Sequence, residues 1–111
     1  MVFNILIHNT DDHLRNHGFL VDESGIRLSP AYDINPSTDR NELSLAINEV
    51  DTICDVSIAL EAHAEYGLSK IEAEEIIERA TEAVASWRGE ATLLGIPKTE
   101  QELMAAAFEM A

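Results

Sequence analysis

The chain has 111 residues, a length typical of one domain that buries roughly two-thirds of the surface exposed by its unfolded form. A hydrophobic content of 46% argues against intrinsic disorder. The chain has 21 acidic and 7 basic residues, and its net charge of −14 predicts that it does not bind nucleic acid directly. One cysteine, no signal-like segment and no run of about twenty apolar residues predict a soluble, cytoplasmic protein with no disulfide and no membrane association.

Two parts of different character make up the chain, and we predict that they form a single domain. Residues 1–50 hold turn-forming residues, β-formers and clusters of Asn and Asp, whereas residues 51–111 are rich in Ala and Glu with helical spacing. No internal repeat and no Gly/Ser linker separates them. The expected fold class is α+β, mainly α, with a short β-hairpin packed on a C-terminal helical bundle.

The first element is the apolar run "VFNILI", residues 2–7. A run of this length suits either a buried strand or the end of a helix, because periodicity does not separate the two. It leads directly into the polar stretch "HNTDDHLRNHGF", residues 8–19, which holds three His, two Asp and two Asn. This composition fits three kinds of structure: a solvated turn, a metal cluster or a catalytic loop.

In the turn reading, Asn9 and Asp12 satisfy backbone donors at a helix end. In the metal reading, His13 and His17 stand at helical i, i+4 spacing with His8 nearby, which suits zinc. The strand pattern that begins at Gly18 argues against a continuing helix there, and the stretch has neither a neighbouring cysteine nor an HExxH pattern. His17 is then expected to start a strand, and His8 to pack the loop.

A hairpin is predicted for "FLVDESGIRLSP", residues 19–30, because β-formers flank an Asp-Glu-Ser-Gly turn in which Gly25 can take a positive φ. The outer ends of two such strands lie side by side. Asp33, in "AYD" just after the hairpin, should therefore return close to Asn16 although seventeen residues separate them. Two candidate metal ligands are thereby brought together.

The positions Asp11, Asn16 and Asp33 also match a known spacing. Protein kinases carry a catalytic Asp, four residues, a metal-binding Asn, a hairpin and a second metal-binding Asp. More closely, "NTDDHLRNHGFL" with "LSPAYDINP" resembles the HipA family, bacterial toxin kinases of toxin–antitoxin modules, in which a T-D-x-H-x-K/R-N loop precedes a Y-D motif. The match is densest over residues 3–36 and extends through the helices as the C-terminal part of that kinase fold.

The resemblance implies a serine/threonine protein kinase that uses ATP and Mg²⁺. Asp11 would accept or orient the proton of the substrate hydroxyl, and Asn16 and Asp33 would supply hard oxygen ligands to the metal and its ATP. His13 or Arg15 would face the transferred phosphoryl group; His13 is preferred, since Arg15 could instead hold the loop to the acidic second half. The resemblance also makes the apolar run the last two turns of a helix that feeds the catalytic loop.

The resemblance further implies partners: a protein substrate, and an antitoxin or an N-terminal kinase lobe. Only ten residues precede Asp11, with no phosphate-covering loop and no phosphate-binding Lys among them. We therefore expect a truncated chain, a split subunit or a remnant, inactive alone, that self-associates through Val2, Phe3 and Ile5 or Leu6. The alternative is a non-catalytic module that binds a regulator.

Helix signals dominate residues 51–111. Asp55 is the predicted N-cap of "VSIALEAHAEY", Gly67 its left-handed stop, and Ser69 with Glu72 a capping box for the next helix. The apolar positions of that helix predict one buried stripe: Ala73, Ile76, Ile77, Ala80, Val84 and Trp87.

The last helix is expected after Gly95 and Pro97, opened by a capping box of Thr99 and Glu102. Met104, Phe108 and the neighbouring alanines should pack inward, and Trp87 should anchor the core. His63 is expected to be a half-buried packing residue. These helices are interpreted as scaffold, and the chemistry is assigned to the first half.

Overall fold

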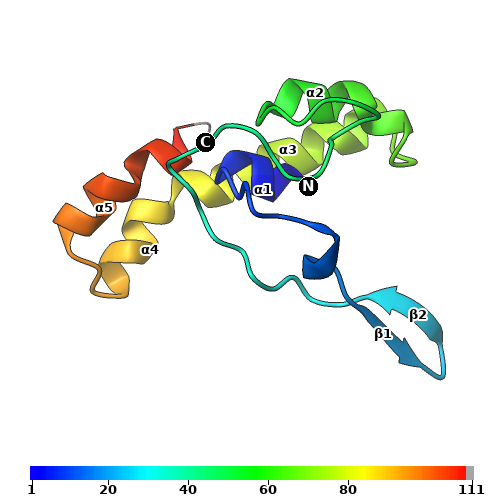
Figure 1. The fold of residues 1–111 in the computed structure, drawn as a ribbon, viewed down its shortest axis with the longest axis horizontal. Helices are drawn as coiled ribbons and strands as arrows, with labels where there is room; N and C mark the ends of the chain where they lie inside the picture. The colour runs from blue at the N-terminus through cyan, green and yellow to red at the C-terminus, as the bar shows by residue number, and fades with distance from the viewer. Residues whose placement is uncertain (110–111) are drawn as a thin grey trace.

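The structure is a computed structural model that describes residues 1–109, and the expected class, α+β and mainly helical, is confirmed (Figure 1). The elements in chain order are α1 (Val2–Leu6), β1 (Phe19–Asp22), β2 (Gly25–Leu28), α2 (Val56–Glu61), α3 (Lys70–Ala85), α4 (Trp87–Leu93) and α5 (Lys98–Met104). Short 3₁₀ helices lie at Leu14–Asn16, Ala62–Ala64 and Ala105–Phe108. Among the described residues, no helix has both the length and the apolar character needed to cross a membrane.

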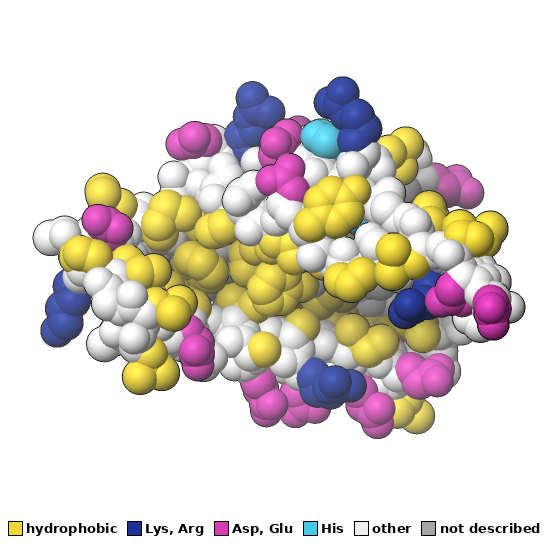
Figure 2. All heavy atoms as spheres, turned by 90° about the horizontal axis from the view of Figure 1, so that it is seen from below, with side chains coloured by type: hydrophobic (Ala, Val, Ile, Leu, Met, Phe, Trp, Pro, Cys, Tyr) yellow, Lys and Arg dark blue, Asp and Glu magenta, His cyan; other side chains and the backbone are white. Residues whose placement is uncertain are grey.

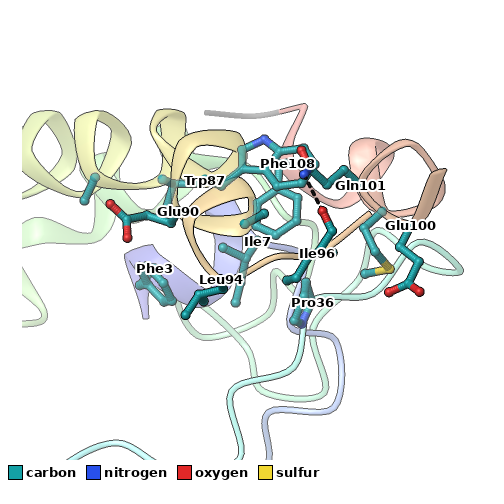
Figure 3. A pocket seen from close by; sticks show the side chains of 14 residues that line it. Phe3, Ile7, Pro36, Trp87, Glu90, Leu94, Ile96, Glu100, Gln101 and Phe108 are labelled. Atoms are coloured by element: carbon teal, nitrogen blue, oxygen red, sulfur yellow. Dashed lines mark hydrogen bonds between the residues drawn. The ribbon is translucent and has the colours of Figure 1, made fainter. Parts of the chain in front are cut away.

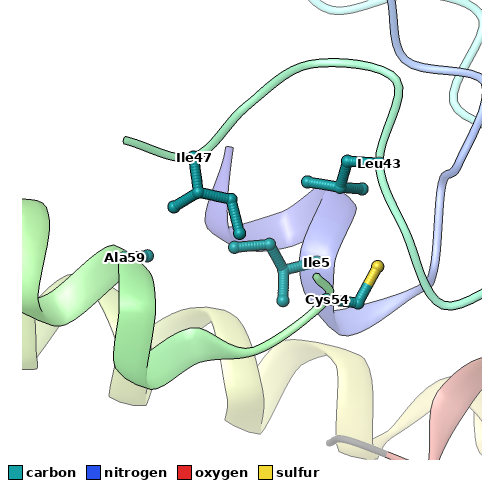
Figure 4. Packing of buried hydrophobic residues seen from close by; sticks show 5 residues of the cluster. All are labelled: Ile5, Leu43, Ile47, Cys54 and Ala59. Atoms are coloured by element: carbon teal, nitrogen blue, oxygen red, sulfur yellow. The ribbon is translucent and has the colours of Figure 1, made fainter. Parts of the chain in front are cut away.

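Helix α1 lies at the centre of the molecule, against α2 and α3 (Figure 1). The helical alternative for residues 2–7 is thus confirmed. Ile5 is fully buried and packs against side chains of α2 and of the preceding loop, namely Leu43, Ile47, Cys54 and Ala59 (Figure 4). Leu6 and Ile7 pack on Val84 of α3. A helix of five residues is not stable by itself, so this packing holds α1 in place.

The burial of α1 corrects the expected self-association surface. Ile5 and Leu6 are fully buried, and Val2 is half-buried, because the loop of residues 43–54 folds over this helix. Of the predicted residues only Phe3, with 43% of its surface accessible, is exposed.

The β-hairpin forms as predicted, with Phe19 opposite Leu28 and Asp22 opposite Gly25, whose φ is 121°. Its expected packing on the helical bundle is wrong. All residues of both strands are exposed, and the hairpin projects away from the helices (Figure 1). The physical reason is that α1, α2, α3 and the loop of residues 43–54 fill the core among themselves, so that only the base of the hairpin meets the rest of the chain.

The first helix signals of the second half are confirmed. The Asp55 carboxylate accepts a hydrogen bond of 2.8 Å from the Ser57 amide at the start of α2, and Gly67 takes a φ of 70°. Ser69 and Glu72 form the predicted capping box of α3. His63 is half-buried, as expected, and its Nδ1 donates to the carbonyl oxygen of Leu68 at 2.7 Å.

The single buried stripe is only partly correct. Ala73 and Val84 are buried, but Ile76 is 40% exposed, and α3 ends at Ala85. Trp87 begins α4 and is half-buried; its ring stacks on Phe108 with 4.3 Å between the ring centroids. Trp87 therefore joins α4 to the C-terminal segment and does not anchor the core.

The capping box predicted for the last helix is wrong. Helix α5 begins at Lys98, directly after Pro97, so Thr99 lies inside it. Glu102 turns to α4 instead, where its carboxylate accepts a 2.8 Å hydrogen bond from Arg88. A tertiary ion pair has replaced the local contact that the sequence pattern suggested.

The cap of α2 leads to a first prediction. Asp55→Ala should lower the free energy of unfolding by about 1 kcal/mol, because the Ser57 amide loses its acceptor. Hydrogen bonds from the hydroxyl and amide of Ser57 hold the pKa of Asp55 below its usual 3.8. The stabilisation is thus complete above the usual pKa and is lost as the pH falls through the lowered value.

Urea denaturation at pH 7 and at pH 2.5 measures this effect. The difference between wild type and Asp55→Ala should shrink at the lower pH. Asp39→Ala, a change at an exposed carboxylate, serves as the matched control. A difference of the same size at both pH values would contradict the assigned cap.

Candidate functional site

The base of the hairpin is closed by side chains from both of its ends. Asn16 Nδ2 donates to Asp33 Oδ2 at 2.7 Å, and the Tyr32 hydroxyl donates to the carbonyl oxygen of Arg15 at 2.9 Å. The Ser29 amide donates to the Gly18 carbonyl oxygen, also at the base. The predicted proximity of Asn16 and Asp33 is confirmed.

Asp33 has an unusual backbone. Its φ of 55° lies in the left-handed region, which residues other than Gly seldom adopt, although Asp and Asn adopt it more often than most. Its second carboxylate oxygen accepts from Asn35 Nδ2 at 2.8 Å. Backbone strain of this kind is found preferentially at functional sites. Asp33 is exposed, so its carboxylate is open to solvent and to a ligand.

The loop before the hairpin is folded onto itself as a 3₁₀ turn, Leu14–Asn16. Asn16 Oδ1 accepts from the His13 amide at 3.2 Å, and the Asn16 amide donates to the His13 carbonyl oxygen at 2.8 Å. Asn16 is buried. The amide group of this one residue therefore links the turn to Asp33 on the far side of the hairpin.

The two adjacent aspartates have opposite surroundings. Asp11 is exposed, whereas only 3% of the Asp12 surface is accessible. Asp12 was expected to accept backbone hydrogen bonds, and this is wrong: its oxygens accept from Asn4 Nδ2 at 2.6 Å and His17 Nε2 at 2.8 Å. Because α1 brings Asn4 beneath the loop, a side-chain donor from the core replaces the backbone donors.

Asn9 differs from its prediction in the same way. Its side chain does not cap a backbone donor but donates through Nδ2 to Asn4 Oδ1 at 3.2 Å. Sequence reasoning missed Asn4 altogether. The available signal was a lone amide inside the apolar run "VFNILI", since a buried polar side chain requires hydrogen-bond partners.

The histidines of the loop are separated from one another by their partners. His17 bonds Asp12, and β1 begins at Phe19, so the expected strand start at His17 is wrong: this residue ends the preceding 3₁₀ turn. His8 Nδ1 donates to the Ala107 carbonyl oxygen at 2.9 Å. His8 therefore packs the loop against the C-terminal segment, as expected. Within residues 1–109, no three His, Cys, Asp or Glu side chains come together to hold a metal ion.

His13 and Arg15 remain predicted site residues. His13 is half-buried; its Nδ1 is shielded from solvent and has no hydrogen-bond partner among residues 1–109. The Arg15 side chain is exposed and belongs to none of the ion pairs found in that part of the chain. Its suggested contact with the acidic second half is therefore not seen.

The chemistry of Asn16 and Asp33 suits Mg²⁺. A carboxylate and an amide oxygen are hard ligands, and Mg²⁺ usually takes only one or two ligands from the protein, with water and phosphate completing its shell. Asp33 already presents its carboxylate at the surface. Asn16 turns its amide nitrogen toward Asp33; a half-turn of that amide would present Oδ1 instead and would give up the bond that Oδ1 accepts from the His13 amide.

A second feature is an apolar cavity of about 470 Å³ between α1, α4 and α5 (Figure 3). Its walls include Phe3, Trp87, Leu94, Ile96 and Phe108. Two carboxylates, Glu90 and Glu100, lie among the lining residues, which include no Lys or Arg. In Figure 2 hydrophobic side chains gather along a hollow in the face seen from below, with acidic side chains around it. This cavity offers binding surface but no catalytic group beyond carboxylates.

Comparison with known proteins gave one finding. A family model described as the HipA-like C-terminal domain matches residues 1–88, which include the whole of the loop, the hairpin and α1 to α3. No curated protein and no solved structure matched the chain.

Proposed function

Because the chain belongs to the family of HipA-like C-terminal domains, we propose that it carries the catalytic loop of a serine/threonine protein kinase that uses ATP. The observation that supports this most directly is the 2.7 Å contact between Asn16 and Asp33, two residues whose kinase counterparts hold the metal. The hairpin that joins these two residues at its base supports the proposal, since protein kinases also separate their two metal-binding residues by a hairpin.

Asp11 is the proposed base. Phosphoryl transfer depends more on the positions of the reacting groups than on a strong base. An exposed carboxylate that accepts a hydrogen bond from the substrate hydroxyl is therefore sufficient. Asp11 would accept the proton of the substrate hydroxyl and orient its oxygen toward the phosphorus atom. The exposure of Asp11 leaves room for a protein substrate to approach.

Asn16 and Asp33 would hold Mg²⁺ through their side-chain oxygens. Bound there, the metal would neutralise charge on the phosphate oxygens of ATP. Hydrogen bonds from Asn16 and Asn35 restrict the Asp33 carboxylate, which supports this role. His13, which is half-buried, would donate a hydrogen bond to the transferred phosphoryl group, and the exposed Arg15 is the alternative donor.

The experiment is phosphate transfer from radiolabelled ATP by the full-length protein in the presence of Mg²⁺, with a generic protein substrate. Label is expected on serine or threonine, and only with metal present. Residues 1–111 alone serve as a control and should transfer none, because the two Lys of the sequence, Lys70 and Lys98, belong to α3 and α5 and not to the loop or the hairpin. Absence of transfer by the full-length protein, with ATP binding intact, would contradict the proposal.

A second candidate function is partner binding through the apolar cavity beside α4 and α5. We propose a basic amphipathic helix as its occupant. The walls supply apolar surface, with Leu94 79% exposed, and the lining carboxylates of Glu90 and Glu100 would attract Lys and Arg. A second copy of this chain is disfavoured as the occupant, since its charge of −14 would be repelled.

The test uses two synthetic helical peptides, one of Leu and Lys and one of Leu and Glu. The full-length protein should bind the Leu/Lys peptide, and Leu94→Asp should weaken that binding by tenfold or more, on the order of 1–2 kcal/mol. Leu103→Asp, at a leucine that is 76% exposed and outside the cavity, is the matched control. Equal binding of both peptides, or equal effects of both variants, would overturn this candidate.

A further inference from the structure

We propose that Asn4 and Asp12 are positioning residues: they fix the loop that carries Asp11 and Asn16 onto helix α1. This inference rests on the proposed kinase function and deepens it. Neither residue would touch the substrate or the metal. Their effect on catalysis would pass through the geometry of the loop.

The observation is a chain of buried side-chain hydrogen bonds that ends at one carboxylate. Asn9 Nδ2 donates to Asn4 Oδ1 at 3.2 Å, and Asn4 Nδ2 donates to Asp12 Oδ2 at 2.6 Å. His17 Nε2 donates to Asp12 Oδ1 at 2.8 Å from the other end of the loop. Asn4, Asn9 and Asp12 are 9%, 2% and 3% exposed. Each oxygen of the Asp12 carboxylate therefore has one side-chain donor.

Such a network resists movement of the loop. A buried carboxylate is costly unless its oxygens are hydrogen-bonded, so any movement of Asp12 away from its donors is opposed. Asn4 lies in α1, next to the fully buried Ile5, so one end of the network is part of the core. At its other end the network includes His17, the residue directly after Asn16. The hydrogen-bonded residues therefore lie on both sides of the segment from Asp11 to Asn16.

A buried, hydrogen-bonded charge adds little to the free energy of unfolding, because well-packed apolar residues of the same size often stabilise a fold equally or more. What the network does supply is one defined position for the loop. Asp12 is held inward while its neighbour Asp11 remains exposed. Displacement of a catalytic group by about 1 Å can cost about 10²-fold in rate, so the effect on kcat should exceed the effect on folding.

The experiment exchanges the two residues in the full-length protein. Asn4→Asp alone places a second carboxylate against Asp12 and should lower kcat by about 10²-fold. The double variant Asn4→Asp with Asp12→Asn restores every bond: Asn9 and the new amide donate to the new carboxylate, and His17 donates to the amide oxygen. The double variant should therefore recover most of the lost kcat, and KM for ATP should stay unchanged in both proteins.

Hydrogen exchange supplies a readout that does not depend on activity. The amides of His13 and Asn16, which bond within the loop, should exchange faster in Asn4→Asp and return to the wild-type rate in the double variant. Asp39→Asn, at an exposed carboxylate, should change neither exchange nor kcat. Circular dichroism identifies a variant that fails to fold, in which case the double variant alone, compared with wild type, decides the outcome.

The inference is overturned if Asn4→Asp folds and keeps wild-type kcat, or if the double variant folds but stays as slow as the single one. If the wild-type protein transfers no phosphate while loop exchange responds as expected, the proposed function fails and the positioning of the loop stands. If the wild-type protein is active and exchange does not respond, the inference fails alone.

Discussion

Asp11→Ala in the full-length protein should lower kcat by about 10²–10⁴-fold, the range that a positioned base contributes. Asp33→Ala should abolish transfer as well, because the metal would lose its carboxylate ligand. Both side chains are exposed, so neither change creates a cavity, and circular dichroism should match wild type. Phosphate transfer from radiolabelled ATP is the measurement, and Asp39→Ala, also at an exposed position, should retain full activity.

Magnesium dependence separates the two roles. Asn16→Asp keeps an oxygen at the metal position but loses the amide that donates to Asp33, so the site should be weakened and not destroyed. Excess Mg²⁺ should then partly restore Asn16→Asp by mass action. It should leave Asp11→Ala unchanged, because the base is absent at any metal concentration. Equal rescue of both variants would contradict the assignment of Asp11 as base and Asn16 as ligand.

Ile5→Ala should lower the free energy of unfolding by about 2–5 kcal/mol. This is a large share of the total for a typical domain, which is about 5–15 kcal/mol. Ile5 is fully buried, and the loop of residues 43–54 and α2 meet on it (Figure 4). Removal of its side chain leaves a cavity that three segments of the chain cannot all close.

Urea denaturation followed by circular dichroism measures this loss. Val50→Ala, at a position 79% exposed, is the matched control and should change the free energy of unfolding by less than about 0.5 kcal/mol. A change as small in Ile5→Ala would mean that α1 is not the centre of the core. Loss of Ile5 should also slow catalysis, since the loop reaches the core through the neighbouring Asn4.

Local features could be predicted from the sequence because their causes lie within a few residues. The caps at Asp55 and Ser69 depend on amides two and three residues away, and the hairpin depends on the turn at Gly25. The pairing of Asn16 with Asp33 followed from the hairpin, since two strands joined by a tight turn must end side by side. The candidate metal site is therefore local in origin although its members are seventeen residues apart.

The sequence by itself determined the family, the loop, the hairpin and the first caps of the helical half. Only the tertiary structure decided what Asp12, Glu102 and Trp87 contact, because each has its partner on another element: Asn4 on α1, Arg88 on α4 and Phe108 in the C-terminal segment. The buried Asp12 needs hydrogen-bond donors and takes the one that α1 brings beneath it, whereas the exposed Glu102 is drawn to the opposite charge of Arg88 on the neighbouring helix. The exposed hairpin has the same explanation, since a strand pattern specifies which faces are apolar but not whether another element covers them.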